Sequence, residues 1–144
     1  MKTGIRRLFF SIEEFETPLS LMEGMGRTRN LDTFNTQTIL DQANRISTGE
    51  FDYYSYHRIQ NGDPPNWFVN PFNNQVFPET DLHWTKIPDF QTEFGDIKNL
   101  WEVSRFDWLI TLARAFTVSG NLTYLEIGDK WLGDWLRNNP LNQG

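Results

Sequence analysis

The clearest pattern of hydrophobic and polar positions lies in the last third of the chain. Residues 96–119 contain no glycine or proline, and their apolar positions predict one continuous helix about 36 Å long. Gly120 suits the left-handed position that follows a helix, and Asn121 suits the N-cap of a second helix ending near Asn138. Two helices joined by so short a turn are predicted to form an antiparallel hairpin.

The second helix of this predicted hairpin has one polar face. That face consists of Glu126, Lys130, Asp134 and Arg137, which recur at helical spacing among apolar neighbours, and it predicts exposure of Glu126, Lys130 and Arg137. Four side chains of the hairpin are expected in the core: Trp101, Leu112, Trp131 and Trp135.

A row of charges on the first predicted helix needs its own explanation. Lys98, Glu102 and Arg105 fall on one line of that helix. Further along, the same line is apolar: Leu109, Leu112 and Phe116. Charged side chains on a stripe that becomes core must pair or face a cavity. We therefore predict that Glu102 and Arg105 interact and that both are at least half buried.

The first fifty residues are also expected to be helical. Residues 8–12 predict a short amphipathic helix, and apolar residues recur at helical spacing over residues 39–46. Thr33 or Asn35 can cap the latter helix, and Gly49 can end it.

Residues 51–94 have a different character. They hold five of the seven prolines and many Asn and Asp residues, which is typical of loops, although a short strand could form at residues 51–56. Six aromatic residues are distributed through the loop: Trp67, Phe68, Phe72, Phe77, Trp84 and Phe90. A disordered linker would lack these rings, so we predict an ordered loop held against a helical body by its aromatic side chains.

These patterns predict a single all-α domain over residues 1–144. It comprises a helical segment (1–50), an aromatic-rich and proline-rich loop (51–94) and a helical hairpin (95–144). A chain of 144 residues is long enough to bury one sizeable core.

Composition and charge exclude several classes of protein. The chain has no cysteine, which rules out disulfides, thiolate metal sites and a cysteine nucleophile. No apolar run approaches the roughly 18 residues of a membrane span, and the net charge of −6 argues against binding to nucleic acid. The apolar run at residues 8–12 is too short for an export signal, which predicts a cytoplasmic protein, or a periplasmic one if the native start differs.

The aromatic content leaves two interpretations open. Six Trp, twelve Phe and four Tyr exceed the usual needs of a small helical core. The rings can serve core packing, since each buries a large area, or they can form a surface that stacks on sugar rings.

A resemblance adds to this interpretation. The segment Gly95-Asp96-Ile97-Lys98-Asn99-Leu100-Trp101-Glu102-Val103-Ser104-Arg105-Phe106 resembles a signature of the heparinase II/III-like family of polysaccharide lyases. Downstream, the similarity continues through Leu112-Ala113, Gly120, Tyr124, Trp135 and Asn139-Pro140. Upstream, it includes Asn66-Trp67, Asn70-Pro71, Phe77-Pro78 and Trp84-Thr85-Lys86-Ile87, so that it covers about residues 46–144.

The resemblance implies an incomplete (α/α) toroid of helical hairpins around a cleft, followed in such lyases by a β-sandwich domain. It also implies β-elimination of a uronate-containing polysaccharide. The family's neutralising Asn or His and its Tyr/His acid–base pair lie in segments that would follow this chain. We therefore expect an N-terminal portion of a lyase that contributes part of the substrate groove and no catalytic residue. Its expected partners are an anionic polysaccharide and the remaining toroid and β-sandwich regions of the same protein.

The candidate substrate-binding residues are Lys98, Trp101, Glu102 and Arg105. Lys98 or Arg105 would meet sugar carboxylates and Trp101 would stack on a ring. The same residues can instead be a paired charge row that fixes the helix against its neighbour.

Other chemistry finds no support in the sequence. His57 and His83 have no motif around them, and no cluster of histidines and carboxylates has metal-site spacing, so we expect no metal and no cofactor. The alternative function is a non-catalytic helical module that binds carbohydrate or acts as a scaffold.

Overall fold

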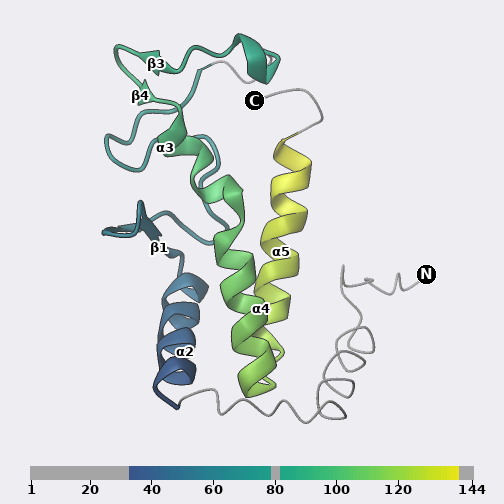
Figure 1. Ribbon diagram of the computed structural model, residues 1–144. Coiled ribbons are helices and arrows are strands. Elements are labelled where there is room, and N and C mark those ends of the chain that lie inside the picture. Colours follow the sequence, from purple (N-terminus) through teal and green to yellow (C-terminus); the bar gives the residue numbers. More distant parts are fainter. Residues whose placement is uncertain (1–32, 79–81, 140–144) are drawn as a thin grey trace, which may run out of the picture.

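The computed structural model describes residues 33–78 and 82–139. Its main helices are α2 (Thr33–Ser47), α4 (Asp107–Ser119) and α5 (Thr123–Asn138). Helix α4 packs against both α2 and α5. The smaller elements lie beyond the C-terminal end of α2 (Figure 1). These smaller elements are β1 (Glu50–Tyr53), β2 (His57–Gln60), η1 (Trp84–Lys86), β3 (Phe90–Gln91), β4 (Gly95–Asp96), α3 (Lys98–Trp101) and η2 (Val103–Arg105).

Gly49 ends the α2 segment, as its position in the sequence predicts. Its φ of +84° lies in the left-handed region, and its N–H donates to the carbonyl of Ile46 at 2.7 Å. A Cβ at this position would collide with the carbonyl of Gly62. Glycine is therefore required where the chain leaves α2 and enters β1.

The expectation of an all-α chain built as an incomplete toroid is wrong. Within the described residues, β1 pairs with β2 and β3 pairs with β4 in two antiparallel two-stranded sheets, which makes the fold a mixture of α and β structure. The predicted strand at residues 51–56 is the first half of a hairpin. Tyr54 and Ser55 both have positive φ values, 50° and 69°, as a tight turn of the type I′ class requires.

The predicted helix over residues 96–119 is interrupted. It consists of α3, η2 and α4, and Phe106 between the last two has a left-handed φ of 62°. The Phe106 ring packs edge-on against Trp108 and Trp135, with ring centroids 5.8 and 5.0 Å apart. Aromatic packing thus accompanies a break that neither glycine nor proline indicates. Consequently, the row of Lys98, Glu102 and Arg105 does not continue into the core as one helical line.

The α4–α5 hairpin confirms the sequence pattern. Gly120 has a φ of 68° and donates its N–H to the carbonyl of Phe116 at 2.7 Å. Asn121 Oδ1 accepts the N–H of Thr123 at 3.1 Å, at the start of α5, and that helix ends at Asn138.

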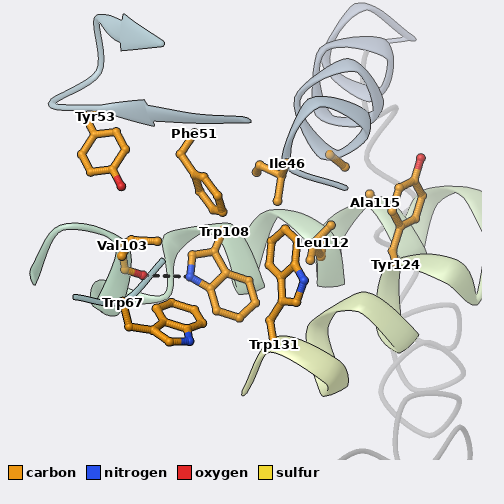
Figure 2. Packing of buried hydrophobic residues seen from close by; sticks show 11 residues of the cluster. Ile46, Phe51, Tyr53, Trp67, Val103, Trp108, Leu112, Ala115, Tyr124 and Trp131 are labelled. Carbon is orange, nitrogen blue, oxygen red and sulfur yellow. Dashed lines mark hydrogen bonds between the residues drawn. The ribbon is translucent and has the colours of Figure 1, made fainter. Parts of the chain in front are cut away.

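The largest core joins α2, β1, α4 and α5 (Figure 2). Trp131 and Leu112 are fully buried in it, as predicted, whereas Trp101 and Trp135 are only partly buried. Trp108 Nε1 donates to the carbonyl of Val103 at 2.8 Å, which ties α4 to η2. The predicted exposure of Glu126, Lys130 and Arg137 is confirmed.

A second, smaller core holds the long loop in place. It consists of Phe77, Ile87, Phe94, Ile97 and Leu100. Of the six predicted loop aromatics, Trp67 and Phe77 are buried and Phe68 is partly buried. Phe72, Trp84 and Phe90 are exposed. Some rings therefore anchor the loop, and others are displayed on its surface.

The helix predicted around residues 8–12 lies outside the described residues. So do residues 1–32 in general, which form most of the segment expected to be helical. Across the described ranges, no helix combines the length and apolar character that a membrane crossing requires.

Candidate functional site

The candidate site lies where α3 and η2 meet the β1–β2 hairpin. Arg105 Nη1 is 3.2 Å from Glu102 Oε2, which confirms the predicted interaction. The Glu102 side chain is 17% exposed but that of Arg105 is 58% exposed, so the predicted burial is right for the first and wrong for the second. The interrupted helix lets the guanidinium extend into solvent instead of pointing along a core-facing stripe.

The other two candidate residues occupy different surroundings. Lys98 is exposed, and its Nζ lies 3.9 Å from Oδ1 of Asp96. The same Asp96 oxygen accepts the backbone N–H of Lys98 at 2.9 Å, which starts α3. Trp101 packs against the smaller core. The structure therefore brings Glu102 and Arg105 together. Trp101 mainly packs against the smaller core.

Glu102 faces a small cavity of about 80 Å³ between α2, β1 and the start of α4. The charged residues that line it are Arg45, Glu50, Asp52, Glu102 and Asp107. A water molecule occupies about 30 Å³ in the liquid, and pockets for small-molecule ligands typically measure about 300–1,000 Å³. This cavity can hold a few water molecules or a hydroxyl group, but it is too small for a sugar ring.

An ion-pair network forms the rim of the cavity. Arg45 lies 3.3 Å from Glu50 and 3.0 Å from Asp52, and Arg58 reaches the same two carboxylates at 3.4 and 3.3 Å. Asp52 and Arg58 are direct partners in the β1–β2 register. The network joins the end of α2 to both strands of the hairpin.

Two carboxylate oxygens at this cavity are buried and accept no hydrogen bond. They are Glu50 Oε1 and Glu102 Oε2. Arginine nitrogens lie 3.2–3.4 Å from them, yet their N–H groups do not point at these oxygens well enough to form hydrogen bonds. Because buried polar atoms are normally satisfied, water or hydroxyl groups in the cavity are the suitable donors.

Two tyrosines flank Glu102 on the hairpin. Burial raises the pKa of the Tyr53 hydroxyl, and the negative charge of Glu102 raises it further. Burial also raises the pKa of Tyr54, as do Glu102 and Asp96, while Arg105 opposes the shift. Both hydroxyls are therefore protonated at neutral pH and act in hydrogen bonding, not as bases.

The two hydroxyls have defined partners. Tyr54 Oη donates to Asn99 Oδ1 at 2.7 Å, and Tyr53 Oη accepts a hydrogen bond from Asn61 Nδ2 at 2.9 Å. The first bond joins the hairpin turn to α3. It places the Tyr54 ring within electrostatic reach of Arg105.

An aromatic surface extends from Tyr54. Phe72 stacks on it, with ring centroids 6.2 Å apart and planes inclined by 21°. His57 meets Phe72 edge-on at 5.5 Å, and the adjoining Tyr56 is 82% exposed. We call Tyr54, Tyr56, His57 and Phe72 the aromatic surface.

Several of these residues were missed by sequence reasoning. The sequence pattern places Tyr54 in a strand and Phe72 among the loop anchors, and it gives no sign of a particular role for Asn99. The signal that could have found the ion-pair network is the alternation of Glu50 and Asp52 in a strand opposite Arg58. No comparable local signal connects Tyr54 with Asn99.

Among residues 33–78 and 82–139, no group of three or more His, Asp or Glu side chains is placed to hold a metal ion. Comparisons with protein-family models, curated proteins and solved structures gave no match for this chain. The resemblance to heparinase II/III-like lyases therefore stays a prediction that rests on the motif itself.

Proposed function

We propose that this chain binds an anionic, uronate-containing polysaccharide and forms part of the substrate groove of a lyase similar to the heparinase II/III-like family. The observation that carries the proposal is the exposed guanidinium of Arg105, within electrostatic reach of Tyr54, on whose ring Phe72 stacks. Lys98 adds a second exposed cation at the start of α3.

This combination suits acidic sugars for two physical reasons. A guanidinium can donate two parallel hydrogen bonds to one carboxylate, which gives direction as well as charge. The apolar faces of sugar rings can pack on exposed aromatic side chains such as Phe72 and Tyr56. A polymer lying across the aromatic surface would place its carboxylates toward Arg105 and Lys98.

The small cavity beside Glu102 can contribute to the same binding by accepting hydrogen bonds from sugar hydroxyl groups. Four carboxylates and one arginine line it, so a uronate carboxylate is repelled from its interior. Neutral sugar hydroxyls, by contrast, can donate to Glu102 at its mouth. The polymer would therefore remain on the surface and direct hydroxyl groups, not carboxylates, toward Glu102.

The proposed role is binding and not chemistry. Elimination requires a base that removes a proton next to a uronate carboxyl group and an acid that protonates the leaving oxygen. The raised pKa values of Tyr53 and Tyr54 make these hydroxyls poor bases. Under the proposal, other regions of the parent lyase supply the acid–base groups.

Titration calorimetry with alginate and heparan sulfate, against neutral dextran, tests the proposal. We expect binding to the acidic polymers only, and at least about tenfold weaker binding for Arg105→Gln, since one charge-assisted hydrogen bond contributes roughly 1.5–3 kcal/mol. Arg114→Gln is the matched control, because it removes the same charge from an exposed position on α4. Equal losses in both variants, or equal binding to dextran, would contradict the proposal.

An activity assay distinguishes this role from a complete enzyme. Incubating the 144-residue chain with the same polymers should give no ultraviolet absorbance from unsaturated products. Absorbance that rises with time and with protein concentration would contradict the assignment as a binding portion. If neither binding nor cleavage occurs, the scaffold alternative is the better description.

A further inference from the structure

The aromatic surface depends on one side chain that comes from outside the β1–β2 hairpin. Phe72 lies in the loop that follows β2, yet its ring contacts three rings of the hairpin. The ring centroids of Tyr53, Tyr54 and His57 lie 5.8, 6.2 and 5.5 Å from that of Phe72. The position of Phe72 therefore decides whether these rings form one continuous surface.

Residues 70–75 form a tight loop with Phe72 near its tip. The N–H of Asn70 donates to the carbonyl of Gln75 at 2.9 Å, and the carbonyl of Asn70 accepts the N–H of Asn74 at 2.9 Å. These bonds close the loop on itself. They do not fix the loop relative to the rest of the molecule, so other contacts must hold Phe72 against the hairpin.

The side chain of Asn70 provides such a contact. It is only 1% exposed, its Oδ1 accepts the backbone N–H of Phe72 at 3.0 Å, and its Nδ2 donates to the carbonyl of Phe94 at 2.6 Å. The first bond is an Asx turn, in which an Asn oxygen accepts from the residue two positions further on. Because Phe94 belongs to the smaller core, Asn70 ties the backbone of Phe72 to a buried part of the fold.

An amide satisfies both partners of this site at once. Its oxygen accepts from Phe72 and its nitrogen donates to Phe94, so neither buried group is left without a partner. A carboxylate at position 70 would keep the acceptor for Phe72 but would set a second acceptor against the Phe94 carbonyl. A protonated carboxyl group again has one donor and one acceptor.

A neighbouring asparagine has similar bonds but no contact with Phe72 through its side chain. Asn73 Nδ2 donates to the same Phe94 carbonyl at 3.0 Å, and its Oδ1 accepts the N–H of Gln75 at 3.0 Å. Asn73 is exposed, in contrast to Asn70. The two residues therefore allow the same substitution to be compared with and without the bond to Phe72.

We propose that Asn70 is a positioning residue for sugar binding: its buried amide holds Phe72 where the ring joins the hairpin rings and receives the polysaccharide. This inference rests on the proposed function, because it concerns the same surface. Asn70 is buried and does not touch the polymer itself, so it acts through Phe72.

Titration calorimetry with alginate tests the proposal at neutral to weakly basic pH. Asn70→Asp should weaken binding several-fold, as Phe72→Ala does, and the two losses should not add in the double variant because they act through one ring. Asn73→Asp places the same negative charge in the same loop and should leave binding nearly unchanged.

A second titration at lower pH separates positioning from general damage to the fold. Burial raises the pKa of a carboxyl group, so a carboxyl group at position 70 should become protonated at about pH 5 and regain its donor. Asn70→Asp should then recover binding relative to the wild type at the same pH, whereas Phe72→Ala should not.

Circular dichroism establishes which variants are folded. If Asn70→Asp is unfolded at neutral pH, Asn70→Ser replaces it, with Asn73→Ser as its control. The uncharged serine side chain is too short to reach both partners, so the same loss of binding is expected, without recovery at lower pH.

Several outcomes would overturn the proposal and leave the proposed function standing. They are wild-type binding in Phe72→Ala or in the Asn70 variant, equal losses in the Asn70 and Asn73 variants, and additive losses in the double variant. Failure of the proposed function gives a different result, since the wild type itself then binds no acidic polymer and the role of Asn70 is rejected with it.

Discussion

The hydroxyl of Tyr54 donates a 2.7 Å hydrogen bond to Oδ1 of Asn99 and so connects the turn of the first hairpin to α3. Tyr54 does this from a positive φ of 50°, which a bulky side chain rarely adopts. The contact positions an aromatic ring within electrostatic reach of Arg105 in η2. The proposed polysaccharide surface therefore depends on it.

Replacing Tyr54 with phenylalanine should separate this hydrogen bond from the ring. We expect Tyr54→Phe to lower the free energy of unfolding by about 0.5–1.5 kcal/mol, the net value of one hydrogen bond. Urea unfolding measures the change. Tyr56→Phe is the control, because Tyr56 lies in the same turn and is almost fully exposed, so it should leave stability unchanged. Equal effects of the two substitutions would show that the Tyr54–Asn99 bond contributes nothing.

The ion pair of Glu102 and Arg105 should contribute little to stability. Since Arg105 is largely exposed, a double-mutant cycle on Glu102→Gln and Arg105→Gln should give a coupling of about 0–1 kcal/mol. Asp134 and Arg137 form an ion pair of the same spacing and the same 3.2 Å distance, so they provide a matched cycle. A coupling of about 3 kcal/mol or more would mean that Arg105 is buried in solution.

Trp131 should be the most sensitive tryptophan of α5. It is fully buried, and its Nε1 donates to Asp63 at 2.6 Å, so Trp131→Ala should cost about 3–5 kcal/mol. Trp135→Ala should cost less, because that side chain is only partly buried. Arg137→Ala should change stability by less than about 0.5 kcal/mol. If α5 faces the core as described, the urea midpoint should fall most for Trp131→Ala, less for Trp135→Ala and least for Arg137→Ala.

Stability should depend on the protonation of Asp63. Hydrogen bonds from Lys130 and Trp131 hold the pKa of its carboxyl group below the usual value for an aspartate. A lowered pKa stabilises the folded state above the unfolded value, and this contribution disappears as the pH falls through the lower, folded value. Because Asp63 is about half exposed, the effect should not exceed about 1 kcal/mol.

Comparing the wild-type protein with Asp63→Asn measures this contribution. The variant should be less stable near neutral pH, and the difference in urea midpoint should shrink as the pH falls below about 4, where the carboxyl group begins to protonate in the unfolded chain. Glu126→Gln, on the exposed face of α5, controls for the loss of one negative charge. A difference between the wild type and Asp63→Asn that stays constant with pH would show that the carboxylate charge is not the stabilising feature.

Local patterns in the sequence determined the hairpin of α4 and α5. Gly120 and Asn121 mark its turn, and the polar spacing of Glu126, Lys130 and Arg137 identifies its solvent face. These features depend on residues within a few positions of one another. Helical periodicity and capping are sufficient to predict them.

The candidate site was only partly accessible to such reasoning. The i,i+3 spacing of Glu102 and Arg105 predicts their contact, because it operates within one turn. The exposure of Arg105 does not follow from spacing, since it depends on the break at Phe106. The cavity beside Glu102 forms only when α2 and β1 pack against α4.

The tertiary structure alone decided where regular elements stop and which distant side chains meet. Phe106 leaves the helical conformation as its ring packs on Trp135, a residue 29 positions away that carries no signal in the local sequence. Tyr54 turns the chain into a hairpin while its hydroxyl bonds to Asn99. In both cases packing or hydrogen bonding between separated segments outweighs local conformational preference, and a local pattern contains no information about that balance.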